Sequence, residues 1–259
     1  TRSIWVTGVQ TCALPIRQPQ PALLHAYGGY NVAFVPQYPN AMATFIAAGG
    51  TYVHAHLRGG AEYGFDWWRA GSGRNKQRSY EDVYAVARDV VAKGMTASHL
   101  LGLTGGSNGG LMAGVAMTQH PEMWRVVVPH VPLLDVIGWC RDPYGLNGFK
   151  TDMGDPDDAQ DVAFFASLSP YYQVKEEVEY PAVFVDAGDA DPRCPPSHAR
   201  KFAARLQAAY RGDSPMLVHV WEKAGHGWAT AEDVQVEQQT EWLAFVMQQL
   251  KMQPAEVSG

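Results

Sequence analysis

LLGLTGGSNGGLMAGVAMTQHP, residues 100–121, places a cluster of glycines between two apolar runs. The short run before the glycines is typical of a buried strand, and the longer run after them is typical of a helix that Pro121 stops. Ordered glycine costs backbone entropy, so its concentration around the single hydroxyl of Ser107 needs a physical reason. We predict a tight strand–turn–helix junction in which larger side chains would not fit.

The turn itself, GGSNG at residues 105–109, matches the G-x-S-x-G pattern that presents a nucleophilic serine in hydrolases. The pattern alone is common, but a buried strand before it and a helix after it are the context that this chemistry requires. The start of that helix would also point free N–H groups at a developing negative charge. We therefore predict that Ser107 is a nucleophile. The alternative is a glycine-rich turn that only packs closely or holds a phosphate.

Apolar runs and helical stretches alternate along the rest of the chain, which is typical of βαβ units on a parallel sheet. Strands are expected at residues 22–29, 51–60, 100–106, 125–135, 181–189 and 216–223. Helices are expected at residues 42–50, 79–94 (capped by Ser79), 109–121, 197–210 and 233–250. Segment 135–178 is expected to be an excursion over the carboxyl edge of the sheet. The predicted fold class is α/β, with a mostly parallel central sheet and helices on both faces, and ligands should bind beyond the carboxyl ends of the strands.

A serine nucleophile needs an adjacent base, and the base needs an acid that orients it. In EKAGHGW, His226 lies between two glycines on the loop after the last predicted strand, where nothing obstructs its reach. We predict His226 as the general base. The acid should follow the strand AVFVDAG, where Asp186, Asp189 and Asp191 compete. Spacing leaves the choice among them open, and a metal site is the alternative for this group of carboxylates.

Composition argues against several classes of protein. The formal net charge of −6, a pI near 5.8 and the lack of a basic run argue against a nucleic-acid-binding surface. No apolar stretch approaches the ~20 residues that cross a bilayer. Cys12, Cys140 and Cys194 form no CxxC pair and no disulfide framework, and Cys194 is interpreted as a pocket wall. The predicted chemistry needs no cofactor and no metal.

The first residues of the chain have neither strand alternation, nor a helix period, nor the pattern of a signal peptide. A DNA sequence that encodes residues 6–16 resembles a sequencing-library adapter. We interpret residues 1–16 as a translated artefact, and the alternative is an irregular natural arm. The natural domain is then expected at residues 17–252, followed by a tail at 253–259. Any upstream targeting signal would be lost from view, so cytoplasm is only the default location for a chain with two remaining cysteines.

Four separated motifs occur in one order along the chain. They are RGGAEYGFDWWRAGSGRNKQRSYEDV (58–83), TGGSNGGLM (104–112), DADPRCPPSHARKFAARLQ (189–207) and EKAGHG (222–227). Together they resemble the catalytic domain of the prolyl oligopeptidase family of serine peptidases, which has the α/β-hydrolase fold. The resemblance extends from about residue 21 to about residue 250. Asn108 and the NKQ run look more like prolyl oligopeptidase proper than its dipeptidyl- or acylaminoacyl-peptidase relatives.

The resemblance implies a role for individual residues. Ser107 matches the nucleophile and His226 matches the base. Asp191, two residues before the arginine of DPR, matches the orienting carboxylate, and on this ground we prefer it to the other two candidates. Tyr27 in AYGGY matches a tyrosine whose hydroxyl stabilises the oxyanion together with the backbone N–H of Asn108. The alternative for Tyr27 is an aromatic side chain packed beside a glycine turn.

The resemblance also implies a substrate pocket. Arg193 matches an arginine that binds a substrate carbonyl, with a buried salt bridge as the alternative. Phe149 stands where the family has a tryptophan that stacks on the substrate proline. Met153 stands where the family has a tyrosine, and Tyr30 fits another aromatic wall. These residues keep an apolar slot but change its shape, so we expect cleavage after proline without strict preference for it.

The implied function is that of a serine endopeptidase or oligopeptidase that hydrolyses short peptides through an acyl-enzyme. An esterase of the same fold, an inactive fragment of such an enzyme and a non-catalytic binding module are the alternatives. The family also carries a β-propeller domain that covers the active site. The chain has no repeat of ~40–50 residues, so we expect the propeller to lie upstream and to be missing.

Overall fold

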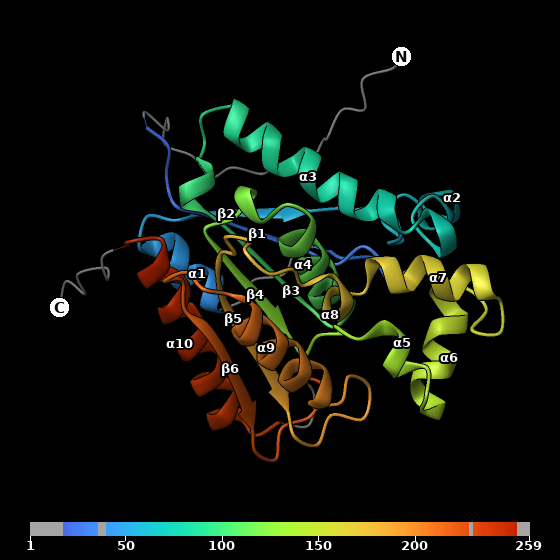
Figure 1. Ribbon diagram of the computed structural model, residues 1–259. Coiled ribbons are helices and arrows are strands. Elements are labelled where there is room, and N and C mark those ends of the chain that lie inside the picture. Colours follow the sequence, from blue (N-terminus) through green and yellow to red (C-terminus); the bar gives the residue numbers. More distant parts are fainter. Residues whose placement is uncertain (1–17, 36–39, 228–229, 253–259) are drawn as a thin grey trace.

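The computed structural model describes residues 18–35, 40–227 and 230–252. In this part of the chain six strands form one sheet in the order β2-β1-β3-β4-β5-β6, and every neighbouring pair is parallel (Figure 1). The strands are β1 (Ala22–Ala26), β2 (Thr51–Ala55), β3 (Leu101–Gly106), β4 (Val126–His130), β5 (Ala182–Gly188) and β6 (Met216–Trp221). The predicted α/β fold is confirmed. The predicted artefact at residues 1–16 and the tail at 253–259 lie outside the described residues.

Helices cover both faces of the sheet and bury its central strands (Figure 1). One face packs against α1 (Asn40–Ala47) and α10 (Glu232–Gln249), and the other packs against α3 (Gln77–Ala92), α4 (Asn108–Gln119) and α9 (Ser197–Ala209). Leu23 faces the first layer and Leu24 the second, and both are fully buried. Burying one such side chain contributes about 1.5–3 kcal/mol. Because both faces are covered, the strands are nearly continuous apolar runs.

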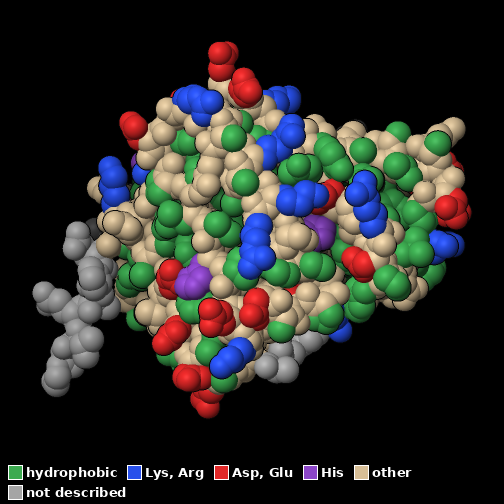
Figure 2. All heavy atoms as spheres, turned by 60° about the horizontal axis from the view of Figure 1, so that its bottom comes forward, with side chains coloured by type: hydrophobic (Ala, Val, Ile, Leu, Met, Phe, Trp, Pro, Cys, Tyr) green, Lys and Arg blue, Asp and Glu red, His purple; other side chains and the backbone are tan. Residues whose placement is uncertain are grey.

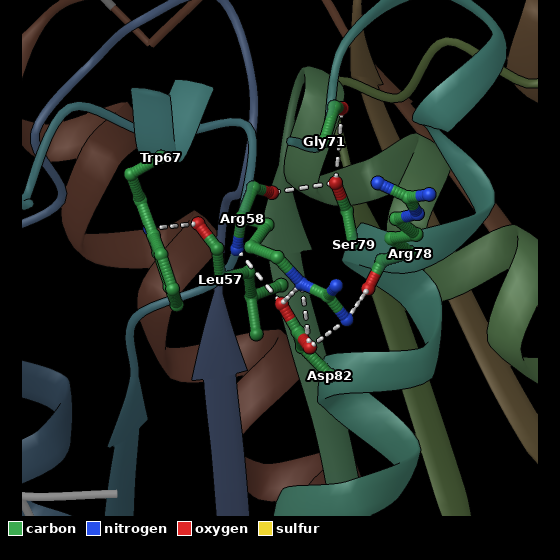
Figure 3. Close-up of polar contacts among 7 residues, drawn as sticks. All are labelled: Leu57, Arg58, Trp67, Gly71, Arg78, Ser79 and Asp82. Carbon is green, nitrogen blue, oxygen red and sulfur yellow. Dashed lines mark hydrogen bonds and ion pairs between the residues drawn. The ribbon is translucent and has the colours of Figure 1, made fainter. Parts of the chain in front are cut away.

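Helix α3 begins two residues earlier than predicted, and Ser79 is not its cap. Ser79 is the third residue of the helix. Its hydroxyl donates to the carbonyl of Arg58, 2.5 Å away, and to that of Gly71, 3.2 Å away (Figure 3). The Arg58 guanidinium forms a two-pronged ion pair with Asp82 on the next turn of α3, with Nη2–Oδ1 at 2.5 Å and Nε–Oδ2 at 2.8 Å. These contacts fix the turn after β2 to α3. A cap assignment made on sequence alone could not include them, because they join residues 8 to 24 positions apart.

The predicted excursion at 135–178 is largely helical. It contains α5 (Val136–Trp139), α6 (Pro143–Asp152), α7 (Ala159–Leu168) and α8 (Pro170–Gln173). The remaining short elements are α2 (Phe65–Arg69) and 3-10 turns at Gly73–Asn75, Ser98–Leu100 and Pro121–Met123. Three aspartates cap the first turns: Asp135 accepts from the Gly138 N–H, Asp142 from the Gly145 N–H and Asp158 from the Gln160 N–H. Helices this short are stabilised by caps and packing rather than by a visible apolar period.

The surface mixes charges of both signs. On the face that Figure 2 shows, basic side chains (Lys or Arg) and acidic side chains (Asp or Glu) both occur among hydrophobic ones. Within the described ranges, no helix combines the length and the apolar character that spanning a membrane would require.

A buried histidine anchors the start of α5. The Asp135 backbone N–H donates to Nδ1 of His198, 3.0 Å away, so this nitrogen must be unprotonated. The Asp135 carboxylate in turn caps the Gly138 N–H and pairs with the ammonium of Lys201. Burial lowers the pKa of His198 from 6.5 to about 4.

We expect the chain to lose stability as the pH falls from about 6.5 to about 4. The unfolded state takes up a proton on His198 below pH 6.5, whereas the folded state excludes it until about pH 4, so the difference reaches about 3 kcal/mol at pH 4. His198→Asn keeps an acceptor oxygen but does not titrate, so it should make this dependence shallower, while His25, whose pKa burial lowers to about 3, keeps its own contribution. Urea unfolding at several pH values measures it, and equal slopes for parent and variant would contradict the assignment.

Candidate active site

Ser107 lies on a sharp turn between β3 and α4, with φ +58° and ψ −117°. A non-glycine residue rarely adopts a positive φ, and the strain must be balanced by the surrounding structure. The Ser107 N–H donates to the His130 carbonyl on the neighbouring strand, 2.9 Å away, and the Ser107 carbonyl accepts from the Leu111 N–H, 3.0 Å away. These two bonds hold the turn at the carboxyl edge of the sheet.

The glycines around Ser107 are required by close backbone approach. A Cβ on Gly105 would lie 2.6 Å from the carbonyl oxygen of Gly109, and a Cβ on Gly109 would lie 2.7 Å from that of Ala26. A Cβ on Gly110 would lie 2.6 Å from Cβ of Pro132. Helix α4 therefore begins pressed against the ends of β1 and β3, with its first amide groups free of intrahelical acceptors.

Asp191 and His226 form a hydrogen-bonded pair. The Asp191 Oδ2 lies 2.7 Å from Nδ1 of His226, and the two side chains are 0% and 8% exposed. The other sequence candidates are engaged elsewhere: Asp189 is exposed, and Asp186 pairs with His130 at 2.9 Å. Of the three competing carboxylates, Asp191 is the one that faces this histidine.

The turn after β5 orients the Asp191 carboxylate. Its Oδ1 accepts from the backbone N–H groups of Arg193, at 2.8 Å, and Cys194, at 3.0 Å, which leaves Oδ2 for His226. Cys194 is buried and also lies beside Ser107. Burial raises the pKa of the Cys194 thiol well above its ordinary value, the charge of Asp191 raises it further, and a hydrogen bond with Ser107 opposes them. Cys194 is thus a neutral wall beside Ser107, which agrees with its interpretation as a pocket residue.

Tyr27 reaches Ser107 from the end of β1. Burial raises the pKa of the Tyr27 phenol to about 12, the charge of Asp152 adds to this, and a hydrogen bond with Ser107 opposes it. The phenol is therefore protonated at neutral pH and available as a donor. Asn108 supports this arrangement, because its side-chain Nδ2 donates to the Tyr27 carbonyl, 2.7 Å away.

A cavity of about 310 Å³ lies beside Ser107, within the size range of about 300–1,000 Å³ that is usual for small-ligand sites. It is lined by Tyr27, Tyr30, Val32, Ser107, Asn108, Leu133, Trp139, Tyr144, Asn147, Gly148, Thr151, Arg193 and Cys194. The walls are thus mainly aromatic and apolar, with a few polar groups. Arg193 and Tyr30, both expected in a substrate pocket, lie in this lining.

Phe149 and Met153 do not lie in the cavity wall, where the resemblance implies them. Both are fully buried in the core and neither is among the residues that line the cavity, and the Phe149 ring packs on Phe165 with 5.2 Å between centroids. The reason is helical geometry. On α6 the cavity side carries Tyr144, Asn147, Gly148 and Thr151, at i, i+3, i+4 and i+7, so positions 149 and 153 turn away from it.

Trp139 and Tyr144 supply aromatic surface that sequence reasoning missed. The Trp139 indole N–H donates to the Arg193 carbonyl, 2.6 Å away, and a Cβ on Gly148 would lie only 2.2 Å from its ring. The indole is thereby fixed against the Arg193 turn and α6. The i, i+3, i+4, i+7 spacing of Tyr144 with Asn147, Gly148 and Thr151 is a helical signal for Tyr144, whereas no local pattern marks Trp139. Within the described part of the chain, no group of three or more His, Cys, Asp and Glu side chains could hold a metal ion.

Comparison with known proteins finds a family model that matches most of the chain. The family model described as the prolyl oligopeptidase family matches residues 36–253. A protein named uncharacterized peptidase y4nA, from Sinorhizobium fredii, is 40% identical over 83% of this chain and 29% of its own length. A prolyl endopeptidase from Elizabethkingia meningoseptica is 32% identical over 89% of this chain and 33% of its own length. The chain thus spans about a third of the length of these relatives.

Solved structures show the same similarity. One match is a structure from a study of two prolyl endopeptidases and of the role of inter-domain dynamics in their catalysis and specificity. Its TM-score is 0.87 and its identity is 36%. That match covers 91% of this chain and 35% of the other. Oligopeptidase B from Leishmania major matches with a TM-score of 0.86 and 28% identity over 91% of this chain and 33% of its own.

Two adjacent glycines provide a matched test of the turn. We expect Gly105→Ala to lower the free energy of unfolding by at least about 1–3 kcal/mol, because its methyl group would collide with two backbone carbonyls. Gly106→Ala should be tolerated, because its nearest contact is His130 Cβ at 3.8 Å. Thermal unfolding of both variants measures the difference, and equal midpoints would contradict this account of the turn.

Proposed function

The chain belongs to the prolyl oligopeptidase family, and from this premise we propose that it is a serine peptidase that hydrolyses short peptides on the carboxyl side of proline. The observation that carries the proposal is the bonded pair of Asp191 and His226 at the sheet edge that also bears the strained Ser107 turn. Cys194 links the two, since its backbone N–H binds Asp191 while its side chain lies against Ser107.

In the proposed reaction, Ser107 Oγ attacks the carbonyl carbon of the scissile bond while Nε2 of His226 takes its proton. Asp191 holds Nδ1–H of His226 and stabilises the imidazolium that forms. The tetrahedral oxyanion is stabilised by the Tyr27 hydroxyl and the Asn108 backbone N–H, and one such donor is worth about 3–4 kcal/mol. The C–N bond then breaks, and the amine leaves with the proton from His226. Water attacks the acyl-enzyme in the same way and releases Ser107.

The cavity supports a substrate with a flat apolar residue at the cleavage site. Trp139 and Tyr30 offer aromatic faces on which a proline ring can pack, and Arg193 can donate to a substrate carbonyl. Relatives of this chain are named prolyl endopeptidases, which supports the same substrate class. Because packing against an apolar slot discriminates by only about 1–3 kcal/mol per methylene, residues other than proline should also be accepted at lower rates.

A missing domain that covers the cavity forms part of the proposal. Val32 and Tyr144, two lining residues, are 45% and 46% exposed and form an apolar rim. An apolar rim around a site is typical of a surface that another domain covers. We propose an upstream propeller as that domain, and its absence would remove the barrier against large substrates.

A serine-directed phosphonate tests the nucleophile. The parent chain should become labelled, and Ser107→Ala should abolish labelling, because no other hydroxyl is placed on the strained turn. Ser167→Ala, at an exposed serine of α7, is the matched control and should label like the parent. Persistent labelling of Ser107→Ala would contradict the assignment. Turnover of a Gly-Pro amide separates the proposed peptidase from an esterase, which would hydrolyse only a simple acyl ester, and from an inactive fragment, which would hydrolyse neither.

Substrate size tests the open rim. We expect the isolated chain to cleave an unstructured protein and a short proline peptide at similar rates per site, because the rim residues Val32 and Tyr144 are exposed in the described part of the chain. Competition between the two substrates in one reaction, followed by mass spectrometry, measures the ratio. Strong exclusion of the protein would overturn the proposal that the covering domain is missing.

A further inference from the structure

A fully buried ion pair lies beneath the turn that carries Tyr27. Lys76 Nζ and Asp152 Oδ2 are 2.6 Å apart, and both side chains are 0% exposed. We propose that this pair is a positioning element for the oxyanion tyrosine, and the inference rests on the function proposed above. Neither residue lines the cavity, so both act through the turn at residues 27–30.

The pair binds the turn at two points. Lys76 Nζ donates to the Gly28 carbonyl, 3.2 Å away, and the Tyr30 N–H donates to Asp152 Oδ1, 2.9 Å away. Asp152 Oδ1 also accepts from the indole N–H of Trp68, 2.7 Å away. The residues that directly follow Tyr27 are thus fixed by the two charges.

The turn needs this support because its backbone is strained. Tyr30 and Asn31 have φ of +57° and +52°, which non-glycine residues rarely adopt, and Gly28 has φ of +63°. Such conformations are unfavourable and persist only where surrounding contacts hold them. The bond from the Tyr30 N–H to a buried carboxylate supplies such a contact.

Packing leaves the turn no room to move toward the pair. A Cβ on Gly29 would lie 2.7 Å from Lys76 Nζ and 2.4 Å from Nδ2 of Asn108. Asn108 holds the Tyr27 carbonyl from the same side. The pair, the turn and the first residue of α4 therefore form one packed unit beside Ser107.

The pair also couples the tyrosine to the cavity wall. Asp152 is the last residue of α6, the helix whose other side presents Asn147 and Thr151 to the cavity. The Asp152 charge contributes to raising the pKa of Tyr27, which favours the protonated phenol as a donor. One buried carboxylate thus links the pocket helix to the group proposed to bind the oxyanion.

Stability alone explains such a pair poorly. Replacing a buried ion pair by apolar groups of similar volume is often neutral or stabilising, whereas removing one partner alone is strongly destabilising. The joint replacement Lys76→Met with Asp152→Leu should therefore fold, while the Gly28 carbonyl and the Tyr30 N–H lose their partners. The matched control is Lys93→Met with Asp89→Leu, which makes the same changes in an exposed pair on α3 and its end.

Kinetics on a Gly-Pro amide form the first test. We expect the buried double variant to lose about 10- to 100-fold in kcat with KM changed by less than about 3-fold, because a misplaced donor weakens only the transition state. The control pair should keep the parental kcat. An unchanged kcat in the buried double variant would overturn the proposal.

A double-mutant cycle with Tyr27→Phe tests whether the pair acts through Tyr27. Once the hydroxyl is absent, the buried double substitution should reduce kcat by less than about 3-fold further. A full additional loss of about 10- to 100-fold would show action by another route and overturn the proposal.

Amide exchange at residues 28–31 gives a readout independent of activity. It should be at least about 10-fold faster in the buried double variant than in the parent, and unchanged exchange would overturn the positioning role even in an inactive chain. If the parent is not labelled by the phosphonate, the proposed function fails while exchange still decides the role of the pair.

If the double variant does not fold, Lys76→Met with Asp152→Asn keeps an acceptor for the Tyr30 N–H. That variant should still lose kcat, and parental kinetics in it would count against the proposal.

Discussion

The close approach of backbone at the start of α4 is the constraint on which the candidate site depends. The carbonyl oxygens of Ala26 and Gly109 occupy the space where side chains at positions 105 and 109 would stand. This contact forces the chain to reverse direction within a few residues and holds Ser107 at φ +58°. Replacing the glycines would separate β1, β3 and α4, whose ends supply Tyr27, Ser107 and Asn108. The strain on one serine therefore reflects the packing of three elements.

Around this turn, buried charges are held by backbone groups as well as by other side chains. Asp191 accepts from two backbone N–H groups in addition to its hydrogen bond with His226. Asp152 accepts from the Tyr30 N–H in addition to its ion pair with Lys76. A carboxylate with several donors tolerates burial and keeps one direction. Each of the two acids thus orients one partner. The result is a rigid polar frame around a cavity whose walls are mainly aromatic.

Several parts of this arrangement could be predicted because their signals are local. The parallel sheet follows from apolar runs that alternate with helical stretches, and the turn at Ser107 follows from glycines at fixed offsets. His226 could be singled out among the histidines because it lies between two glycines on the loop after the last strand. Spacing could not choose among Asp186, Asp189 and Asp191. The choice depends on the direction in which each carboxylate points from the end of β5 and the turn after it. The catalytic roles of these residues stay predictions.

The pocket wall and the buried pair follow from contacts between distant segments. Phe149 and Met153 point into the core because α6 forms as a helix, and that helix is stabilised by an Asp142 cap and by packing rather than by its own apolar period. Lys76 and Asp152 are 76 positions apart and become a pair only when the residue before α3 and the last residue of α6 meet beneath the Tyr27 turn. Short-range patterns specify which segments become strands, turns and long helices, since neighbouring residues set backbone conformation and apolar period. Which side of a short helix faces the cavity, and which charges meet in the interior, depends on the burial free energy of the whole assembly, to which every packed segment contributes.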